Sequence, residues 1–241
     1  MEPTRIEELG TILAVFAHPD DETYLAAGIM ADAVRAGSRV VCVTATRGEL
    51  GSWDEVRWPV SKLGAIREAE LMEGLRILGV REHHWLDYRD GGCGEVPVEE
   101  GTGKILPFVE EVNPDTLLAF GPDGMTNHPD HIATSAWATA AFHEAAKPGA
   151  RLFYATITPE WAEVYVPRFN RFKVFPDGPP ATTPVEELGI MFPLSPDLLE
   201  LKLRAIGAHV SQVEHMLNAF GEDFFREGGA VEAYRLAETK A

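Results

Sequence analysis

The sequence predicts an α/β fold in which a doubly wound, mostly parallel sheet carries helices on both faces. Two observations predict it. Five short runs of apolar and β-branched residues recur along the chain, and segments with helical spacing lie between most of them. Because neighbouring parallel strands need a crossover connection, this alternation favours a Rossmann-like sheet.

The first strands and helices follow from local pattern. Residues 11–16 form an apolar, β-prone run, and residues 39–46 form a second run that is rich in valine and threonine. Between them, residues 24–35 have helical spacing and end just before a glycine, a usual helix stop. Residues 62–78 are expected to form a longer helix, because leucine and isoleucine recur there at three- and four-residue steps.

The next elements continue the alternation. A short strand is expected at 83–86, a helix at 104–112 and a fourth strand at 116–120, with the sequence Asn-Pro-Asp breaking the helix before that strand. Another helix, at about 131–146, precedes a fifth strand at 152–158. These elements complete the predicted parallel sheet.

One domain is expected for the whole chain, 1–241, because a chain of this length can bury one sizeable core. Its core spans about 11–158. Residues 159–196 are rich in proline and aromatic residues and show little periodicity, which favours an irregular extension or flap packed on the sheet. Residues 197–218 return to helical spacing and predict one C-terminal helix.

Charge and hydropathy limit the classes of partner. A net charge of −17 argues against unaided binding to nucleic acid or to anionic lipid. The N-terminus has no basic segment followed by a long apolar one, and no apolar stretch has membrane-spanning length, so a cytoplasmic protein without a membrane partner is expected. A small molecule is the expected partner, and aromatic residues in irregular segments favour a homo-oligomer.

Chemically competent side chains follow the ends of the first four predicted strands. In an open parallel sheet, ligands bind outside the carboxyl ends of the strands, so these loops are expected to meet at one edge. The four loops carry, in order, His18, Asp20, Asp21 and Glu22; Arg47, Gly48 and Glu49; Asp87, Arg89 and Asp90; and Asp123, Asn127, His128, Asp130 and His131.

Two of these loops predict a metal site. His18 and Asp21 are three residues apart at a loop-to-helix junction, so both side chains can point into one space. The sequence His-Pro-Asp-His at 128–131 repeats this design and offers a third ligand. Two histidines and one carboxylate, with a position left for water, are the ligand set of a catalytic zinc, although iron or cobalt also suits it. The alternative is that these polar residues only cap helices.

The motifs resemble those of the PIG-L or LmbE-like zinc-dependent N-deacetylases. The family's opening motif, Ala-His-Pro-Asp-Asp-Glu, stands at 17–22, and its later motif, His-Pro-Asp-His, stands at 128–131. Weaker likenesses are Thr-Arg-Gly-Glu at 46–49, the helix with Arg67 and Glu70, and His-Val-Ser-Gln at 209–212. Order and spacing agree from about residue 11 to 145 and again near 202 to 212.

The resemblance implies a metal centre and a general base. By position, His18, Asp21 and His131 would bind one Zn²⁺ per chain, and Asp20 would take the proton of the attacking water. The implied reaction is hydrolysis of an N-acyl group, most simply acetyl, from an amino sugar of the N-acetylglucosamine type or its conjugate.

Further residues are predicted around that centre. By resemblance, His128 would stabilise the oxyanion or protonate the leaving amine, Asp130 would orient His128, and Arg67 would contact the substrate. Glu49 and Asp90 are predicted substrate contacts too, although turn chemistry alone would explain either residue.

Two rival functions remain open. A phosphoesterase on the same kind of fold would usually need two metals and more carboxylate ligands. A non-catalytic small-molecule-binding relative would be expected to have lost a ligand or the base, whereas Asp20 stands beside every predicted ligand.

Overall fold

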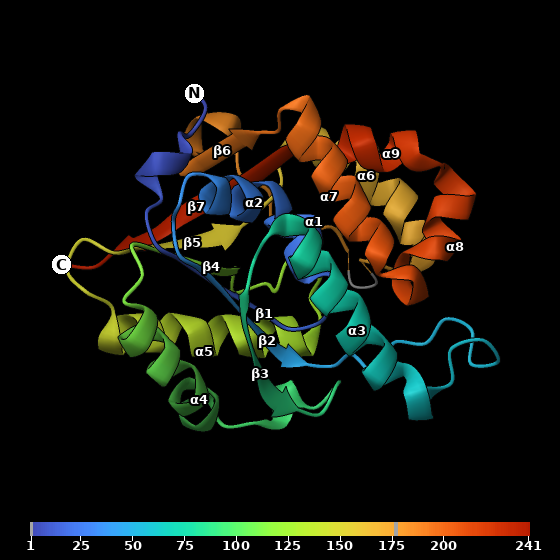
Figure 1. Ribbon diagram of the computed structural model, residues 1–241, viewed down its shortest axis with the longest axis horizontal. Helices are drawn as coiled ribbons and strands as arrows, with labels where there is room; N and C mark the ends of the chain where they lie inside the picture. Colours follow the sequence, from blue (N-terminus) through green and yellow to red (C-terminus); the bar gives the residue numbers. More distant parts are fainter. Residues whose placement is uncertain (1, 176–177) are drawn as a thin grey trace.

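The computed structural model describes residues 2–175 and 178–241, and within them the chain forms a seven-stranded sheet of order β3-β2-β1-β4-β5-β7-β6 (Figure 1). The first five strands run parallel, and β6 and β7 complete one edge in antiparallel pairing. The strands are β1 (Ile12–Phe16), β2 (Val40–Thr46), β3 (Glu82–Tyr88), β4 (Thr116–Phe120), β5 (Arg151–Ala155), β6 (Ile190–Pro193) and β7 (Val231–Thr239). The predicted α/β class is therefore confirmed.

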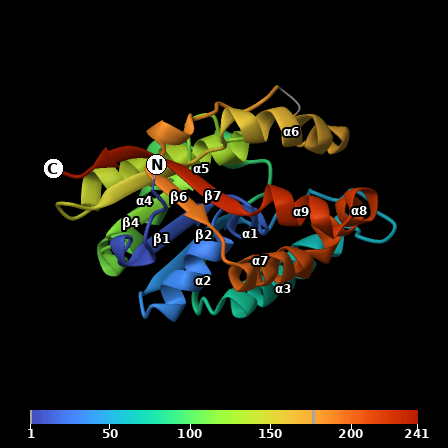
Figure 2. The same cartoon turned by 90° about the horizontal axis from the view of Figure 1, so that it is seen from above.

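Helices cover both faces of the sheet. Figures 1 and 2 place α4 and α5 on one face and α2, α3 and α7 on the other. The α-helices are α1 (Asp21–Leu25), α2 (Ala27–Arg35), α3 (Val60–Leu78), α4 (Val98–Val112), α5 (Pro129–Ala145), α6 (Pro159–Phe169), α7 (Pro196–Ala208), α8 (Val210–Phe220) and α9 (Glu222–Gly228). Short 3-10 turns lie at Ile6–Glu8, Cys93–Glu95, Asn170–Phe172 and Val185–Glu187.

Strand β1 is buried on both faces, which explains its unbroken apolar sequence. Alternate side chains enter different cores: Ile12, Ala14 and Phe16 pack with α2 and α3, whereas Leu13 and Val15 pack with α4 and α5. The strand that leads into the first histidine motif is thus fixed from both sides.

The helix predicted at 24–35 is divided in the structure. Helix α1 begins earlier, at Asp21, and α2 starts afresh after Ala26. The second start is stabilised from the far end of the chain, because the carboxylate of Glu232 accepts hydrogen bonds from the amides of Gly28 and Ile29, at 2.9 and 2.8 Å. A buried carboxylate at a helix start is also favoured by the helix dipole.

The C-terminal region is more regular than predicted. Part of the expected irregular segment, 159–196, forms α6 and β6, and the single helix expected at 197–218 divides at His209 into α7 and α8. Strand β7 was not predicted at all. Its pairing with β5 and β6 joins residues far apart in the sequence, which local pattern cannot reveal.

Among the described helices, none has the length and apolar character needed to cross a membrane.

Candidate metal centre and active site

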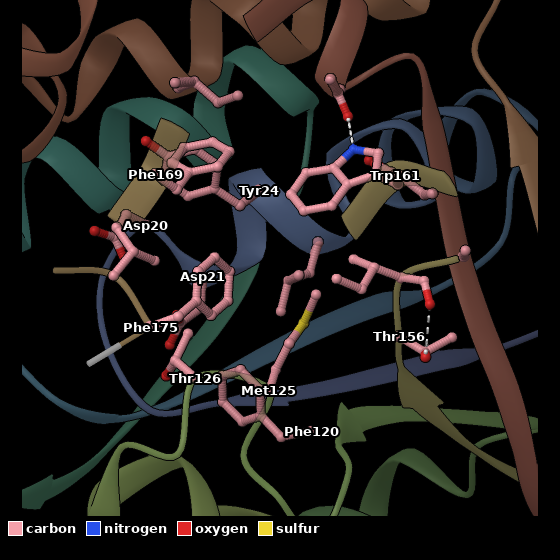
Figure 3. A pocket seen from close by; sticks show the side chains of 18 of the residues that line it. Asp20, Asp21, Tyr24, Phe120, Met125, Thr126, Thr156, Trp161, Phe169 and Phe175 are labelled. Carbon is pink, nitrogen blue, oxygen red and sulfur yellow. Dashed lines mark hydrogen bonds between the residues drawn. The ribbon is translucent and has the colours of Figure 1, made fainter. Parts of the chain in front are cut away.

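The two histidine motifs meet where the strand order reverses. The chain proceeds from β1 outward to β2 and β3, then returns to place β4 on the other side of β1. The first motif follows β1 and the second follows β4, so they flank the switch point at which open α/β sheets bind ligands. A cavity of about 680 Å³ opens there (Figure 3), and residues of both motifs are among those that line it.

Three buried donor groups converge at this point. His18 Nδ1 lies 3.0 Å from His131 Nε2. Asp21 completes the triangle, with Oδ2 3.9 Å from His18 Nδ1 and Oδ1 3.6 Å from His131 Nε2. Ligand atoms around a tetrahedral zinc are ~3.3 Å apart when metal–ligand distances are about 2.0–2.1 Å. The two Asp21 distances run to different oxygens, and Oδ2 also accepts the amides of Ala17 and His18 at 3.2 and 2.8 Å. The predicted trio is thus brought close together, with Asp21 Oδ1 the oxygen that faces His131.

The outer nitrogens of both imidazoles are already engaged. His18 Nε2 lies 3.2 Å from carboxylate oxygens of both Asp90 and Asp130. His131 Nδ1 lies 2.9 Å from the carbonyl of Gly124, which can only accept a hydrogen bond. If each outer nitrogen carries the ring proton, two lone pairs face each other in the buried gap between the rings. Such a gap calls for a cation, and partners of this kind are usual behind metal-bound histidines.

The electrostatics of the pair favour a single positive charge. Burial lowers the pKa of His18, but hydrogen bonds to Asp130 and Asp90 and the charge of Asp21 outweigh burial and raise the pKa to about 10. Burial and the neighbouring charge of His18 hold the pKa of His131 well below its ordinary value. These directions favour one proton on the pair, carried by His18 and shared with a neutral His131, and a metal ion bound at this position would displace that proton.

More donors surround this gap than one ion needs. Two groups of three described residues have donor atoms that all lie within 4.8 Å of one another: His18 with His128 and His131, and His18 with Asp90 and Asp130; Asp21 is in neither group. In the second group, however, Asp130 also accepts the amides of Gly91 and Cys93 at 2.7 and 3.0 Å. That carboxylate is thereby committed to holding its own loop.

Asp20 stands at the start of α1 in a strained backbone conformation, with φ of 119°. Its amide donates to the carboxylate of Glu22 at 3.0 Å. Burial raises the pKa of the Asp20 carboxyl, the charge of Arg67 opposes this, and the resulting pKa is about 6. A carboxyl group with this pKa is suited to accept a proton near neutral pH.

Glu22 is fully buried and joins the motif to the C-terminal helices. Its second oxygen lies 3.0 Å from Nε2 of His209, the residue between α7 and α8. These contacts make Glu22 a partner of the site and not only a carboxylate at a helix start. The divided helix is explained by the same contact, since His209 turns inward where the sequence predicted continuous helix.

Asp130 requires a correction. The resemblance implied that its side chain orients His128, but its carboxylate faces His18 instead. The group that reaches His128 is the backbone amide of Asp130, which donates to Nδ1 at 3.2 Å, because His128 is the N-cap of α5. With Nδ1 accepting, a neutral His128 carries its proton on Nε2. Burial and the charge of His18 lower the pKa of His128, which favours that neutral form.

Three predicted substrate contacts are also engaged within the protein. Arg67, buried on α3, donates to the carbonyls of Gly48 and Pro19 at 2.9 and 2.5 Å. The absence of a side chain on Gly48 leaves room for this guanidinium, since a Cβ there would lie 2.1 Å from Arg67 Nη1. Arg67 lines the cavity all the same and also lies 3.3 Å from Asp20 Oδ2.

Glu49 holds the backbone of Asp90, and Asp90 in turn faces His18. Glu49 accepts the backbone amide of Asp90 at 3.0 Å and is not among the described residues that line the cavity, which corrects its prediction as a substrate contact. Asp90 does line the cavity, but its oxygens face His18 and the amide of Leu50. Burial raises the pKa of Asp90, but contacts with His18 outweigh it and lower the pKa to about 2.

A buried ion pair at the cavity wall was not predicted from the sequence. Lys202 of α7 lies 2.9 Å from Glu232 of β7, and their side chains are 2% and 0% exposed. Lys202 also donates to the carbonyl of Tyr24 at 2.8 Å. Little in the sequence signals this pair, because Lys202 is one of several charged residues on α7 and its partner lies 30 residues away.

A doubly wound sheet that gathers histidines and carboxylates at its switch point has the design of a metal-dependent hydrolase. Comparison with protein families then identifies the particular one. The model described as PIG-L, GlcNAc-PI de-N-acetylase, matches residues 13–142, and the chain belongs to this family. Hydrolytic N-deacetylation is the activity that this membership supports.

Curated relatives span most of the chain. A 1D-myo-inositol 2-acetamido-2-deoxy-alpha-D-glucopyranoside deacetylase from Saccharomonospora viridis is 31% identical over 84% of this chain and 85% of its own. An enzyme of the same description from Mycobacterium sp. (strain KMS) is 27% identical over 90% of this chain and 78% of its own.

Solved structures agree in fold. N,N'-diacetylchitobiose deacetylase from Pyrococcus horikoshii superposes with a TM-score of 0.63 over 96% of this chain and 85% of that one, at 24% identity. At this identity, the likeness shows the fold alone.

Proposed function

We propose that this PIG-L family member removes the N-acetyl group from an N-acetylglucosamine conjugate, using one Zn²⁺ held by His18, Asp21 and His131. The observation that carries the proposal is the convergence of His18 Nδ1, His131 Nε2 and the Asp21 carboxylate within 3.9 Å of one another in the cavity wall. The outer nitrogens of both rings have acceptors, so the inner nitrogens are left to bind a cation.

Zinc suits the donor set, because two imidazoles and one carboxylate leave a fourth position for water. When bound, the ion lowers the pKa of water and polarises the amide carbonyl. Asp90 and Asp130 hold the His18 ring from behind, and Gly124 and Thr126 hold the His131 ring. Two such supports fix the tautomers that coordination needs.

Asp20 is the proposed general base. It lies next to Asp21 in sequence, lines the cavity and has a pKa of about 6, so it is ionised at neutral pH and can take a proton from the attacking water. The contacts of Glu22 and Arg67 hold its strained backbone and its carboxylate in place. Once protonated, Asp20 can return the proton to the departing amine.

His128 is the proposed oxyanion donor. Its Nδ1 accepts the Asp130 amide, so Nε2 carries a proton on a ring that lines the cavity. A neutral donor stabilises the negative oxygen of the tetrahedral intermediate without adding a charge beside the cation. In this proposal Asp20 protonates the departing amine, and His128 stabilises the oxyanion.

The substrate class is supported by the relatives. Those with 31% and 27% identity act, by their names, on an acetamido sugar joined to inositol. An N-acetylglucosamine conjugate is the common chemistry, and the cavity of about 680 Å³ falls within the range of about 300–1,000 Å³ for ligand pockets.

The test is incubation of the zinc-loaded protein with acetylated amino sugars and their glycosides, measuring both acetate and free amine. Equal release of the two products, with one bound metal per chain, is the expected outcome. Absence of turnover on every substrate, with the metal bound, would contradict the proposal. Two metals per chain with release of phosphate from phosphate esters would support the phosphoesterase instead.

A further inference from the structure

The cavity has a second half that the proposed chemistry does not use. Beyond the metal centre it is lined by apolar side chains from α6, α8 and α9, and Figure 3 shows Trp161 and Phe169 facing the same space as Asp20 and Asp21. We call this half the aromatic chamber and define it by Trp161, Phe169, Met216, Phe224 and Phe225.

The aromatic chamber has a built wall. The Trp161 indole donates to the carbonyl of Gly228 at 2.8 Å, which fixes the ring against the C-terminal end of α9. Its ring lies 5.9 Å from that of Phe169 at an angle of 19°, and Phe169 meets Phe224 edge to face at 5.0 Å. Aromatic contacts of this geometry hold rings in defined orientations.

Two pairs of polar groups near the aromatic chamber are engaged with each other, whereas the buried hydroxyl of Tyr24, which also lines the cavity, has no partner among the described residues. Lys202 and Glu232 form their buried ion pair, and the hydroxyls of Thr156 and Thr183 lie 2.9 Å apart. A sugar placed there would give up hydrogen bonds to water and find few free partners in return. An apolar group would lose nothing by leaving water and would cover the rings, so the chemistry of the wall favours an apolar occupant.

We propose that the aromatic chamber binds an alkyl or aryl group carried by the substrate. The inference rests on the proposed deacetylation, since the metal centre and the aromatic chamber share one cavity and one molecule must reach both. The apolar group stands on the amine side, as the aglycone of the amino sugar, or on the acyl side, as a chain longer than acetyl. Both sources present the same surface to the aromatic chamber.

Paired substrates measure the effect on catalysis. The zinc-loaded protein is assayed with methyl and hexyl N-acetylglucosaminides, which differ on the amine side, and with N-acetyl- and N-hexanoylglucosamine, which differ on the acyl side. Burying a methylene favours binding by up to about fourfold. We therefore expect kcat/KM to rise at least about tenfold in one of the two pairs, and that pair identifies the source.

A variant connects the gain to the aromatic chamber. Trp161→Ala should bring the ratio of kcat/KM within the responding pair toward one. Val164→Ala is the matched control, because Val164 is on the same helix, is 47% exposed and does not line the cavity among the described residues. Phe224→Leu serves as a second, more conservative variant in which a reduced ratio is also expected.

Binding without turnover separates the two proposals. Hexyl glucoside has no amide and carries its alkyl group on the aglycone side. If the glucosaminide pair is the one that responds, calorimetry should show that hexyl glucoside binds at least about tenfold more tightly than methyl glucoside, with the gain lost in Trp161→Ala. Equal affinities together with equal kcat/KM within both substrate pairs would overturn the proposal that the aromatic chamber binds an apolar group. The proposed deacetylation would be unaffected by that result. Tighter binding of the hexyl compound without hydrolysis of any amide would retain the aromatic chamber and overturn the proposed function.

Discussion

The two halves of the cavity are built by different means. The metal half consists of loops that leave the buried parallel strands β1 and β4, and hydrogen bonds hold its side chains in place. The aromatic chamber consists of helices α6, α8 and α9, whose contacts are mostly apolar. The difference indicates that the sheet edge fixes the reaction while the C-terminal helices select what is attached to the reacting group.

Removal of a metal ligand should have the largest effect. His131→Ala is expected to abolish stoichiometric metal binding and to lower kcat/KM by about 10⁴-fold or more, because water activation and carbonyl polarisation are lost together. Metal analysis and acetate release measure the two outcomes. A matched change at His143, exposed on the same helix, should leave both unchanged. Full activity of the His131 variant would show that the metal half of the cavity does not carry the reaction.

Asp20→Asn should separate chemistry from metal binding. We expect the metal to remain at one per chain while kcat falls by about 10²–10⁴-fold, the usual contribution of a general base. If kcat is retained, another group takes the proton. If the metal is lost as well, Asp20 belongs to the ligand set.

Glu22→Gln tests the support of the base. The substitution keeps the size of the side chain but weakens its buried contacts with His209 and with the Asp20 amide, so kcat should fall by about 10- to 100-fold with the metal retained. Restoration of a carboxylate by Glu22→Asp should recover part of the loss. An unchanged kcat in Glu22→Gln would show that Asp20 keeps its conformation without this contact.

The dependence of stability on pH can be tested at a residue that lies outside both halves of the cavity. Burial lowers the pKa of His83, on β3, to about 4. Because the unfolded ring takes up a proton at about 6.5 and the folded ring does not, this residue's contribution to stability is present above pH 6.5 and is lost as the pH falls through 4.

The free energy of unfolding, measured against pH, should therefore decline more steeply in the native protein than in His83→Gln. The expected difference is about 2 kcal/mol, since one pKa unit corresponds to about 1.4 kcal/mol and the ring is only partly buried. Parallel curves would mean that His83 is solvated. The comparison also distinguishes loss of fold from loss of catalysis in acid.

The parts predicted from the sequence are those fixed locally. The parallel strands β1, β2, β4 and β5 have mostly apolar or β-branched sequences, and the carboxyl ends of parallel strands must share one edge, so His18, Asp21 and His131 could be expected to meet. The C-terminal region was less legible, because β6 and β7 depend on long-range pairing and Pro167 interrupts the pattern of α6.

Contacts behind the site were equally hidden. Motif spacing gives residue types at an edge but not which carboxylate faces which ring, so Asp130 was assigned to His128 instead of His18. Glu49 was placed at the substrate because nothing in the sequence shows that it holds the Asp90 amide. The expected homo-oligomer and the expected cytoplasmic location stay predictions.

The central claim is that one ion sits between His18, Asp21 and His131. Anomalous diffraction at the zinc edge, from crystals of the metal-loaded protein, tests it directly. The predicted result is one peak about 2.0–2.2 Å from His18 Nδ1, His131 Nε2 and an Asp21 oxygen. A peak on the other side of the His18 ring, between Nε2, Asp90 and Asp130, would contradict the account, as would two peaks in one chain.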